Sequence, residues 1–409
     1  MPKNKECKKI GLRQAQSNPE RCRRIVCLGG GNAMPRAILT GLKKYPVKIT
    51  AICAMLDSGG SAGRLRKDYK IVSPGDIRRA FIALSNTSPV IENLFDYRFK
   101  TGELKGHNFA NLFITALELA TNDYEKTSRE IKKILNVRHE VLPVTLDNSN
   151  LWAVLENGKI IKGETNIDIP KHNGNLKIKK VFLRPKTKAY PKTLEAIKNA
   201  NLIIIGPGDL YSSLAQILLT DGISRAISRS KAKKVYICNL MTKNGETNNF
   251  TVSDFVKEIE KFLGQKGDED KSSSIKFLRS KNEDGDENSF SSTSPFAVAR
   301  VGDEAVASSS PFAVARVGDE AVASSSPFAV ARVLDYVIYN TKIPSPKRLA
   351  DYKKEHPELL DLVRFDKKPA PYRNVVSGAG FIGADILTKS GDVIHDPKKL
   401  TKAIMQIYR

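Results

Sequence analysis

The sequence predicts an α/β protein built on one mostly parallel β-sheet with helices on both faces. Two observations carry this prediction. Short apolar runs recur along the chain, and each run ends in glycine or polar residues before a stretch with helical spacing follows. Strand, turn, helix and strand in this order are typical of parallel sheets, whose connecting loops at the strand ends are available to a ligand.

The predicted elements follow in chain order. We expect the first strand at 24–28, a helix at 35–44 and the second strand at 47–55. Residues 107–136 predict two helices. Glycines punctuate a strand-rich stretch at 139–184, which predicts a small β-containing subdomain. Later apolar runs predict further strands at 202–205, 234–238 and 334–338.

A low-complexity insertion is predicted at 264–332. Its second part repeats one unit, SPFAVARVGDEAVASS, at 294–309 and again at 310–325. This unit is shorter than the roughly 20 to 50 residues of known stacking repeats. Two interpretations stay open: a disordered insertion in a tolerant loop, and a small β element that meets a partner. Without the insertion, residues 23–263 and 333–409 form a single domain, which the flexible basic tail 1–22 precedes.

Composition limits the class of protein. The chain has 409 residues, of which 41% are hydrophobic, enough for a substantial core. No apolar run reaches the roughly 20 residues that span a bilayer. The five cysteines form no C-x-x-C pair, which favours free thiols and no metal cluster. We therefore expect a cytoplasmic protein without membrane insertion.

The net charge of +23 raises the prospect of an anionic partner. The basic residues are spread along the chain, and no zinc finger, aromatic RNA-binding motif or arginine-rich stripe accompanies them. A generally basic surface explains the charge equally well, so nucleic acid is not favoured as the partner. Homo-oligomerisation stays open.

The loop after the first strand is the first candidate site. Gly29, Gly30 and Gly31 let backbone N–H groups approach a phosphate, and Asn32 offers an amide to a ligand hydroxyl. The loop is not a dinucleotide fingerprint, because Met34 occupies the last glycine position, and no Lys-Ser/Thr pair follows as in a P-loop. The alternative is a tight turn without a ligand.

The loop after the second strand combines a carboxylate with glycines and arginines. Asp57 at a strand end is suited to Mg²⁺ or a ribose hydroxyl, and Asp76, in the following Pro-Gly-Asp segment, would share that metal if the two loops converge. Alternatively, Asp76 caps a helix and the loop is an exposed turn. The predicted phosphate ligands of this loop are Gly59, Gly60, Ser61, Arg64 and Arg66.

Three further segments add candidates. His107 stands at a predicted helix start, where it would serve acid–base work or only capping and packing; Asn108 and Asn111 lie within the same turn. Two later strand ends supply backbone donors and hydroxyls where an open parallel sheet binds ligands. Their candidate residues are Gly206, Gly208, Asp209, Tyr211, Ser212, Asn239, Thr242, Glu246 and Thr247.

Taken in order, these motifs resemble a known family. The chain shows GGGNA from Gly29, DSGGSAGRLR from Asp57, PGDIR from Pro74, GPGDLYSS from Gly206 and NLMTKNGET from Asn239. This set resembles the family of the gluconeogenesis factors (YvcK-type) and the CofD-like 2-phospho-L-lactate transferases of deazaflavin coenzyme biosynthesis. The gluconeogenesis-factor branch is the closer match.

The resemblance implies a Rossmann-like fold with a nucleotide site on these loops. For the closer branch it implies a UDP-sugar ligand and a regulatory role that links central carbon metabolism to the cell envelope or cell shape. The chain departs from the family pattern at Asn32, Ser58 and Asp209. Ser58 removes one carboxylate beside Asp57, and Asp209 brings a negative charge towards the expected phosphates.

The competing interpretation is an enzyme, as the more distant branch implies. A Mg²⁺-dependent transferase would move a phospholactyl-type group from a nucleotide-activated donor, with Asp57 and Asp76 on the metal and Arg64 and Arg66 on the phosphoanhydride. Asp57, Asp76 and His107 are then the catalytic candidates. No clear nucleophile stands out in the sequence, so a regulatory binding protein is favoured over an enzyme.

Overall fold

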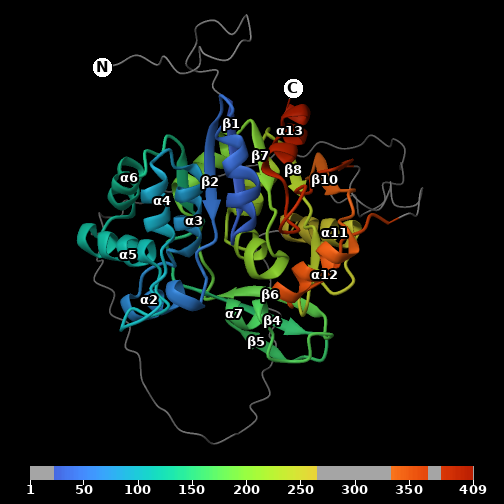
Figure 1. The fold of residues 1–409 in the computed structure, drawn as a ribbon, viewed down its shortest axis with the longest axis horizontal. Coiled ribbons are helices and arrows are strands. Elements are labelled where there is room, and N and C mark those ends of the chain that lie inside the picture. The colour runs from blue at the N-terminus through green and yellow to red at the C-terminus, as the bar shows by residue number, and fades with distance from the viewer. Residues whose placement is uncertain (1–22, 265–332, 367–378, 409) are drawn as a thin grey trace, which may run out of the picture. The chain divides into compact units, whose positions relative to one another are not determined.

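The computed structural model describes residues 23–264, 333–366 and 379–408 (Figure 1). The predicted tail 1–22 lies outside the described residues. So does the predicted insertion 264–332, apart from Gly264.

The central sheet has seven strands in the order β12-β10-β8-β7-β1-β2-β3, and every neighbouring pair is parallel (Figure 1). This confirms the predicted mostly parallel α/β sheet. The apolar runs form strands because a parallel sheet is covered on both faces, so that nearly every residue of β1 and β7 is buried. The strands are β1 (Arg24–Gly29), β2 (Lys48–Cys53), β3 (Glu140–Pro143), β7 (Leu202–Ile205), β8 (Lys233–Ile237), β10 (Tyr336–Asn340) and β12 (Gly380–Ala384).

Strand β1 lies between β2 and β7. Cys27 pairs with Ala51 of β2 on one side and with Ile204 of β7 on the other. The chain first builds outwards through β2 to β3 and only later returns to add β7 on the opposite side of β1. The loops that follow β1 and β7 therefore part in opposite directions, and such a switch point is where open parallel sheets bind ligands.

Helices connect the strands and pack against the sheet. The helix after β1 opens with a π-helical turn, and α3 contacts both η3 and β2. The helical elements are η3 (Pro35–Leu39), α1 (Thr40–Leu42), α2 (Gly60–Tyr69), α3 (Gly75–Leu84), α4 (Pro89–Asp96), α5 (Phe109–Thr121), α6 (Tyr124–Ile134), α7 (Glu164–Asp168), α8 (Pro191–Lys198), η4 (Leu210–Ala215), α9 (Gln216–Leu218), α10 (Ile223–Arg229), α11 (Val252–Gly264), α12 (Pro346–Glu355) and α13 (Pro397–Tyr408).

A smaller antiparallel sheet forms the predicted subdomain. It consists of β4 (Asn150–Leu155), β5 (Ile160–Lys162) and β6 (Ile178–Arg184) in the order β5-β4-β6, and α7 follows β5. The prediction began this subdomain at 139, but β3 belongs to the central sheet. On the outer face of β4, Trp152 has the Lys162 ammonium 5.0 Å and the Arg184 guanidinium 5.3 Å from its ring centre.

A two-stranded antiparallel ribbon joins β9 (Met241–Lys243) to β11 (Leu359–Leu362).

The described part of the chain contains three buried free thiols, Cys27, Cys53 and Cys238. Burial raises their pKa values. Among the described helices, none has the length and apolar character needed to cross a bilayer.

Candidate functional site

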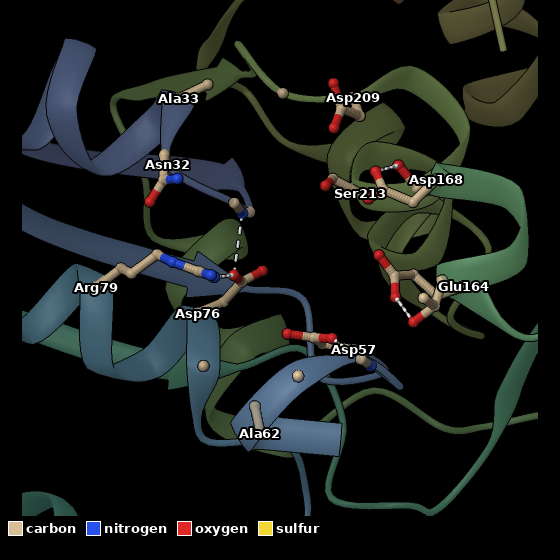
Figure 2. A pocket seen from close by; sticks show the side chains of 18 of the residues that line it. Asn32, Ala33, Asp57, Ala62, Asp76, Arg79, Glu164, Asp168, Asp209 and Ser213 are labelled. Atoms are coloured by element: carbon tan, nitrogen blue, oxygen red, sulfur yellow. Dashed lines mark hydrogen bonds and ion pairs between the residues drawn. The ribbon is translucent and has the colours of Figure 1, made fainter. Parts of the chain in front are cut away.

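A cavity of about 530 Å³ opens at the carboxyl ends of β1, β2 and β7 (Figure 2). Its walls include the loops after β1, β2 and β7, the first turns of α2, α3 and α5, the helix α7 of the small subdomain, and the end of α12. The predicted residues that line it are Gly30, Gly31, Asn32, Asp57, Gly59, Gly60, Ser61, Asp76, Asn111, Gly208, Asp209 and Ser212.

The loop after β1 is fastened to Asp76. The backbone N–H of Gly31 donates to Asp76 Oδ1 at 3.0 Å, and Gly31 has a φ of 62°, in the left-handed region that favours glycine. A Cβ on Gly30 would lie only 2.4 Å from Asp76 Oδ2. Glycine is therefore required at both positions for the loop to meet this carboxylate.

The loop after β7 faces the loop after β1. A Cβ on Gly208 would lie 3.7 Å from the carbonyl oxygen of Gly30, so even a methyl group there would contact the first loop. The N–H of Gly208 donates to Asn239 Oδ1 at 3.4 Å, and the predicted residue Asn239 therefore supports the loop from behind. Two glycine-rich loops thus meet across the switch point of the sheet.

Asp57 and Asp76 extend their carboxylates into the same cavity (Figure 2). Asp57 Oδ1 accepts from Gly59 N at 2.9 Å, and Asp76 Oδ1 accepts from Arg79 Nη1 at 2.5 Å as well as from Gly31. Within the described residues, neither Oδ2 atom accepts a hydrogen bond. Burial raises the pKa of Asp76, Asp57 raises it further, and Arg79 opposes both. Two carboxylate oxygens are thus available for a hard cation such as Mg²⁺.

The two predicted phosphate-binding arginines lie elsewhere. The segment expected to be a loop forms the helix α2 from Gly60 onwards. Arg66 is buried and donates to the carbonyl of Leu56 at 3.2 Å, to Asn148 Oδ1 at 2.7 Å and to the carbonyl of Ser149. Arg64 donates to the carbonyl of Lys105 at 3.3 Å. Neither arginine lines the cavity in this structure, so their contact with a phosphate stays a prediction.

The residues at the start of α5 divide between structure and cavity. Asn108 caps the helix, because its Oδ1 accepts from Asn111 N at 3.1 Å. Ser61 Oγ lies 3.2 Å from His107 Nδ1 and accepts from Asn108 N at 3.2 Å, which ties α5 to the first turn of α2. Burial and the nearby Arg64 lower the pKa of His107. Of the three predicted residues, only Asn111 lines the cavity.

Asp168 and Asp209 lie on the wall across the cavity from Asp76 (Figure 2), and both belong to a charged cluster around Lys243. The Lys243 ammonium contacts Asp168, lies 2.9 Å from Asp209 Oδ2 and lies 3.4 Å from Glu246 Oε1. The negative charge of Asp209, expected to face the phosphates, is therefore paired. The three carboxylates are close enough together to hold a metal ion, but Lys243 already supplies the positive charge between them.

Glu246 supports this cluster from the protein side. Its Oε2 accepts from the N–H groups of Tyr211 at 3.0 Å and Ser212 at 3.1 Å. Burial raises its pKa to about 7 although Lys243 lowers it.

Other predicted residues also serve the scaffold. Thr242 Oγ1 accepts from Asp361 N at 3.0 Å, and Thr247 Oγ1 accepts from Lys243 N at 2.9 Å. The predicted residues outside the cavity wall are Gly29, Arg64, Arg66, His107, Asn108, Gly206, Tyr211, Asn239, Thr242, Glu246 and Thr247.

The subdomain helix α7 adds a wall that the predicted site did not include. Glu164 Oε2 accepts from Ser58 N at 3.3 Å, and Thr165 Oγ1 lies 2.9 Å from Ser58 Oγ. Burial, together with the charges of Asp57 and Asp168, raises the pKa of Glu164 to about 8. Ser58, which departs from the family pattern, thus connects the loop after β2 to the subdomain helix α7.

Further cavity residues were not among the predicted ones, although some stand within the recognised motifs. Arg79 belongs to the PGDIR-Arg segment and Lys243 to NLMTKNGET, so motif membership was the available signal. Tyr352 lies in α12 and His356 directly follows it, and no motif marked either residue. The missed cavity residues include Arg78, Arg79, Arg98, Glu164, Thr165, Asp168, Gln216, Lys243, Tyr352, His356 and Glu358.

The fold and the cavity define an α/β protein with a polar ligand site at the switch point of a parallel sheet. The family model described as 2-phospho-L-lactate transferase CofD matches residues 25–292, and the chain belongs to the CofD family.

Named relatives point to one branch of this family. The chain is 46% identical over 237 residues to the gluconeogenesis factor of Halalkalibacterium halodurans, which covers 58% of this chain and 72% of the relative. It is 43% identical over 243 residues to the gluconeogenesis factor of Bacillus subtilis, covering 59% and 75% respectively. These matches confirm the resemblance that the motifs indicated.

A solved structure supports the fold. The crystal structure of a UPF0052 family member from Bacillus halodurans matches with a TM-score of 0.72 at 32% identity, covering 94% of this chain and 99% of that one. The predicted Rossmann-like sheet is therefore confirmed by both its strand order and its structural relatives.

Proposed function

We propose that the protein binds a nucleoside diphosphate ligand, with a UDP-sugar as the first candidate, and acts as a regulator without turnover. One observation carries the proposal: the glycine loops after β1 and β7 face each other across the switch point, where Gly31 and Gly208 leave room for a ligand against the backbone. The cavity volume of about 530 Å³ lies within the range of roughly 300 to 1,000 Å³ for ligand pockets.

The diphosphate would lie against the segment from Gly30 to Asn32. There it meets backbone N–H groups and the N-terminal end of the following helical segment, a setting that favours anions. Asp57 and Asp76 would hold Mg²⁺ beside it, since each has one carboxylate oxygen without a hydrogen bond among the described residues and both line the cavity. The metal would neutralise the phosphate charge that these two acids otherwise repel.

The regulatory part of the proposal draws on the relatives. Those from H. halodurans and B. subtilis are named gluconeogenesis factors. A UDP-sugar sensor of this kind would link central carbon metabolism to the cell envelope or cell shape. The groups proposed to hold the ligand are backbone N–H groups and carboxylates. These groups suit binding of a ligand without its turnover.

A Mg²⁺-dependent transferase is the second candidate. It is favoured by the family description and by the paired carboxylates of Asp57 and Asp76 on the cavity wall. Positioning and metal-assisted charge neutralisation would then supply most of the catalysis, as is usual for phosphoryl transfer. The two candidates differ in turnover: the transferase consumes its nucleotide-activated donor, and the regulator does not.

Isothermal titration calorimetry with UDP and UDP-sugars, with and without Mg²⁺, tests the binding site. Gly208→Ala places a methyl group in the crevice at 3.6 Å or more from the protein, so the fold tolerates it. We expect this variant to weaken UDP binding by about tenfold or more, equivalent to ~1.4 kcal/mol. Gly264→Ala, whose Cβ would have no neighbour within 4 Å, is the matched control.

Equal affinity in wild type and Gly208→Ala would place the ligand outside the switch point. Absence of any binding by UDP or UDP-sugars would refute the nucleotide proposal as a whole. Mg²⁺-dependent consumption of a nucleotide-activated donor, lost in Asp57→Asn, would replace the regulator with the transferase.

A further inference from the structure

One part of the cavity lies between the N-terminal turns of α2, α3 and α5. We name this part the arginine subsite, and its walls are Ser61, Arg78, Arg98 and Asn111. Arg79 lies next to it on α3. Arg79 supports the first glycine loop through Asp76, whereas Arg78 and Arg98 bond to Asp96 and to the carbonyl of Gly106. The switch-point site proposed above does not use Arg78, Arg98 or Asn111.

Two polar groups of the subsite are buried without a partner among the described residues. Asn111 is 4% exposed, and its Oδ1 makes no hydrogen bond. Arg78 is 7% exposed, and its Nε makes none either. An unsatisfied buried polar group costs about 1–3 kcal/mol, so the Arg78 Nε–H on the cavity wall points to a ligand that accepts a hydrogen bond. Asn111 can serve such a ligand only through the NH₂ of its amide, because its Oδ1 is itself an acceptor.

The charges of the subsite are unevenly compensated. Arg78 Nη1 donates to Asp96 Oδ1 at 2.7 Å, but Asp96 is largely exposed. Arg98 Nη1 donates at 2.7 Å to the carbonyl of Gly106, which carries no net charge. Burial lowers the pKa of Arg78, and the positive charges of Arg79 and Arg98 lower it further, in keeping with crowded cations. The wall is therefore net positive.

The helix termini reinforce this positive field. The N-cap residues of α2 and α3 are Gly59 and Pro74, and neither side chain makes a capping hydrogen bond. The first N–H groups of both helices are thus left without a side-chain cap, and the N-terminal turns of both helices line the cavity. Asp76 in the first turn of α3 is negative, but Arg79 pairs with it. In this arrangement an anion would meet guanidinium groups, an amide and helix N-termini at once.

We propose that the arginine subsite binds a second anionic group, a phosphate or a carboxylate, at the same time as a nucleoside diphosphate occupies the switch point. The inference rests on the proposed function and deepens it. The natural ligand then carries an acidic group besides its diphosphate, or a separate small anion accompanies the nucleotide. Arg98 supplies charge, Arg78 supplies its unpaired Nε–H, and Asn111 turns its amide to donate.

Calorimetry on the full chain tests this proposal with inorganic phosphate and acetate as probes, titrated in the presence of saturating UDP. We expect phosphate or acetate still to bind, and the stronger of the two identifies the class of acid. Arg98→Gln removes a charge, and Asn111→Asp places a carboxylate in the subsite without changing its size. Each should weaken anion binding by about tenfold to a hundredfold, the range for a lost charged hydrogen bond.

Two further variants serve as controls. Arg229→Gln removes an exposed arginine of α10, outside the cavity wall, and should leave anion binding unchanged. Arg98→Lys keeps the charge and should recover most of the affinity. Thermal unfolding confirms that each variant is folded. If Arg98→Gln does not fold, the anion affinity of Asn111→Asp tests the subsite instead.

The outcomes separate this inference from the proposed function. Anion binding that UDP abolishes, or that is equal in wild type and in both subsite variants, would overturn the arginine subsite while leaving the nucleotide site intact. If UDP does not bind, the switch-point proposal fails, and phosphate titrated alone against the same variants still decides whether the subsite exists.

Discussion

Replacement of Lys243 by methionine tests how the cavity wall is held together. The Lys243 side chain is 9% exposed, and its ammonium pairs with Asp168, with Asp209 at 2.9 Å and with Glu246 at 3.4 Å. Methionine keeps the apolar stem but leaves three neighbouring carboxylates without a cation. Removing one partner of a buried ion pair costs about 3–5 kcal/mol. Because Asp168 and Asp209 are partly exposed, we expect ~3 kcal/mol.

The loss should depend on pH. Burial raises the pKa of Glu246 to about 7 even though Lys243 lowers it, so the substitution raises that pKa further. Protonation then relieves the repulsion in acid, and the free energy of unfolding lost at pH 8 should be partly recovered at pH 6. Urea unfolding at both pH values measures the two losses.

Lys261→Met is the matched control. Lys261 lies 3.4 Å from Glu258, the same distance and sequence spacing as Lys243 and Glu246, but its side chain is 50% exposed. We expect this change to cost less than about 0.5 kcal/mol. A second change, Asp209→Ser, should recover at least ~1 kcal/mol in the Lys243→Met background. A Lys243→Met loss below ~1 kcal/mol at pH 8, or an equal loss at both pH values, would refute the reasoning.

Three other predictions concern single residues. Gly30→Ala places a Cβ 2.4 Å from Asp76 Oδ2, so the carboxylate must move and its hydrogen bonds break; thermal unfolding should show a loss of about 2–3 kcal/mol. Arg66→Met removes buried hydrogen bonds, so it should cost about 2–4 kcal/mol in urea unfolding yet leave UDP affinity unchanged by calorimetry. Burial raises the pKa of Glu164 from 4.5 to about 8, so the folded state keeps a proton that the unfolded state releases between these pH values. Stability should therefore fall as pH rises through this window, and Glu164→Gln should remove that contribution when unfolding is followed from pH 5 to pH 9.

Each of these has a contrary result. A Gly30→Ala protein as stable as wild type would mean that the loop and Asp76 adjust freely. Weaker ligand binding by folded Arg66→Met, with unchanged stability, would return Arg66 to the phosphate site. Identical pH profiles for wild type and Glu164→Gln would show that this carboxyl keeps an ordinary pKa.

The strands next to the switch point could be predicted because their apolar runs stop at glycines. The runs at 24–28 and 202–205 correspond to β1 and β7 to within one residue. Their neighbours could not be predicted, since the pairing of Cys27 with both Ala51 and Ile204 depends on contacts far apart in the sequence. The hydrophobic pattern therefore predicts the strands but not their order in the sheet, which depends on tertiary contacts.

The helix α2 shows how glycines can mislead. Gly59, Gly60 and Gly63 suggested a loop, but a Cβ on Gly63 would lie 2.2 Å from the backbone of Ser58. This glycine allows the helix to pack closely against the preceding chain, which is a second use of glycine besides flexibility. Arg66 consequently points into the protein, whereas the loop prediction placed it at a phosphate.

The candidate site divides in the same way. Residues at strand ends, such as Gly30 and Gly208, were predicted because parallel strands bring their carboxyl ends to one edge. Arg78 and Arg98 were not, because their direction depends on how α3 and the segment after α4 pack. Tyr352 reaches the cavity from α12, near the other end of the sequence, and no local pattern marks it.

The small antiparallel sheet gives the protein a built-in optical reporter. Trp152 is the single tryptophan of the chain, and its indole lies beside the cations of Lys162 and Arg184. Indole emission responds to nearby charge and hydration, and α7 connects this sheet to the cavity through Glu164 and Asp168. Any change in tryptophan fluorescence on ligand addition therefore originates in this subdomain, so its movement can be followed in real time without a label.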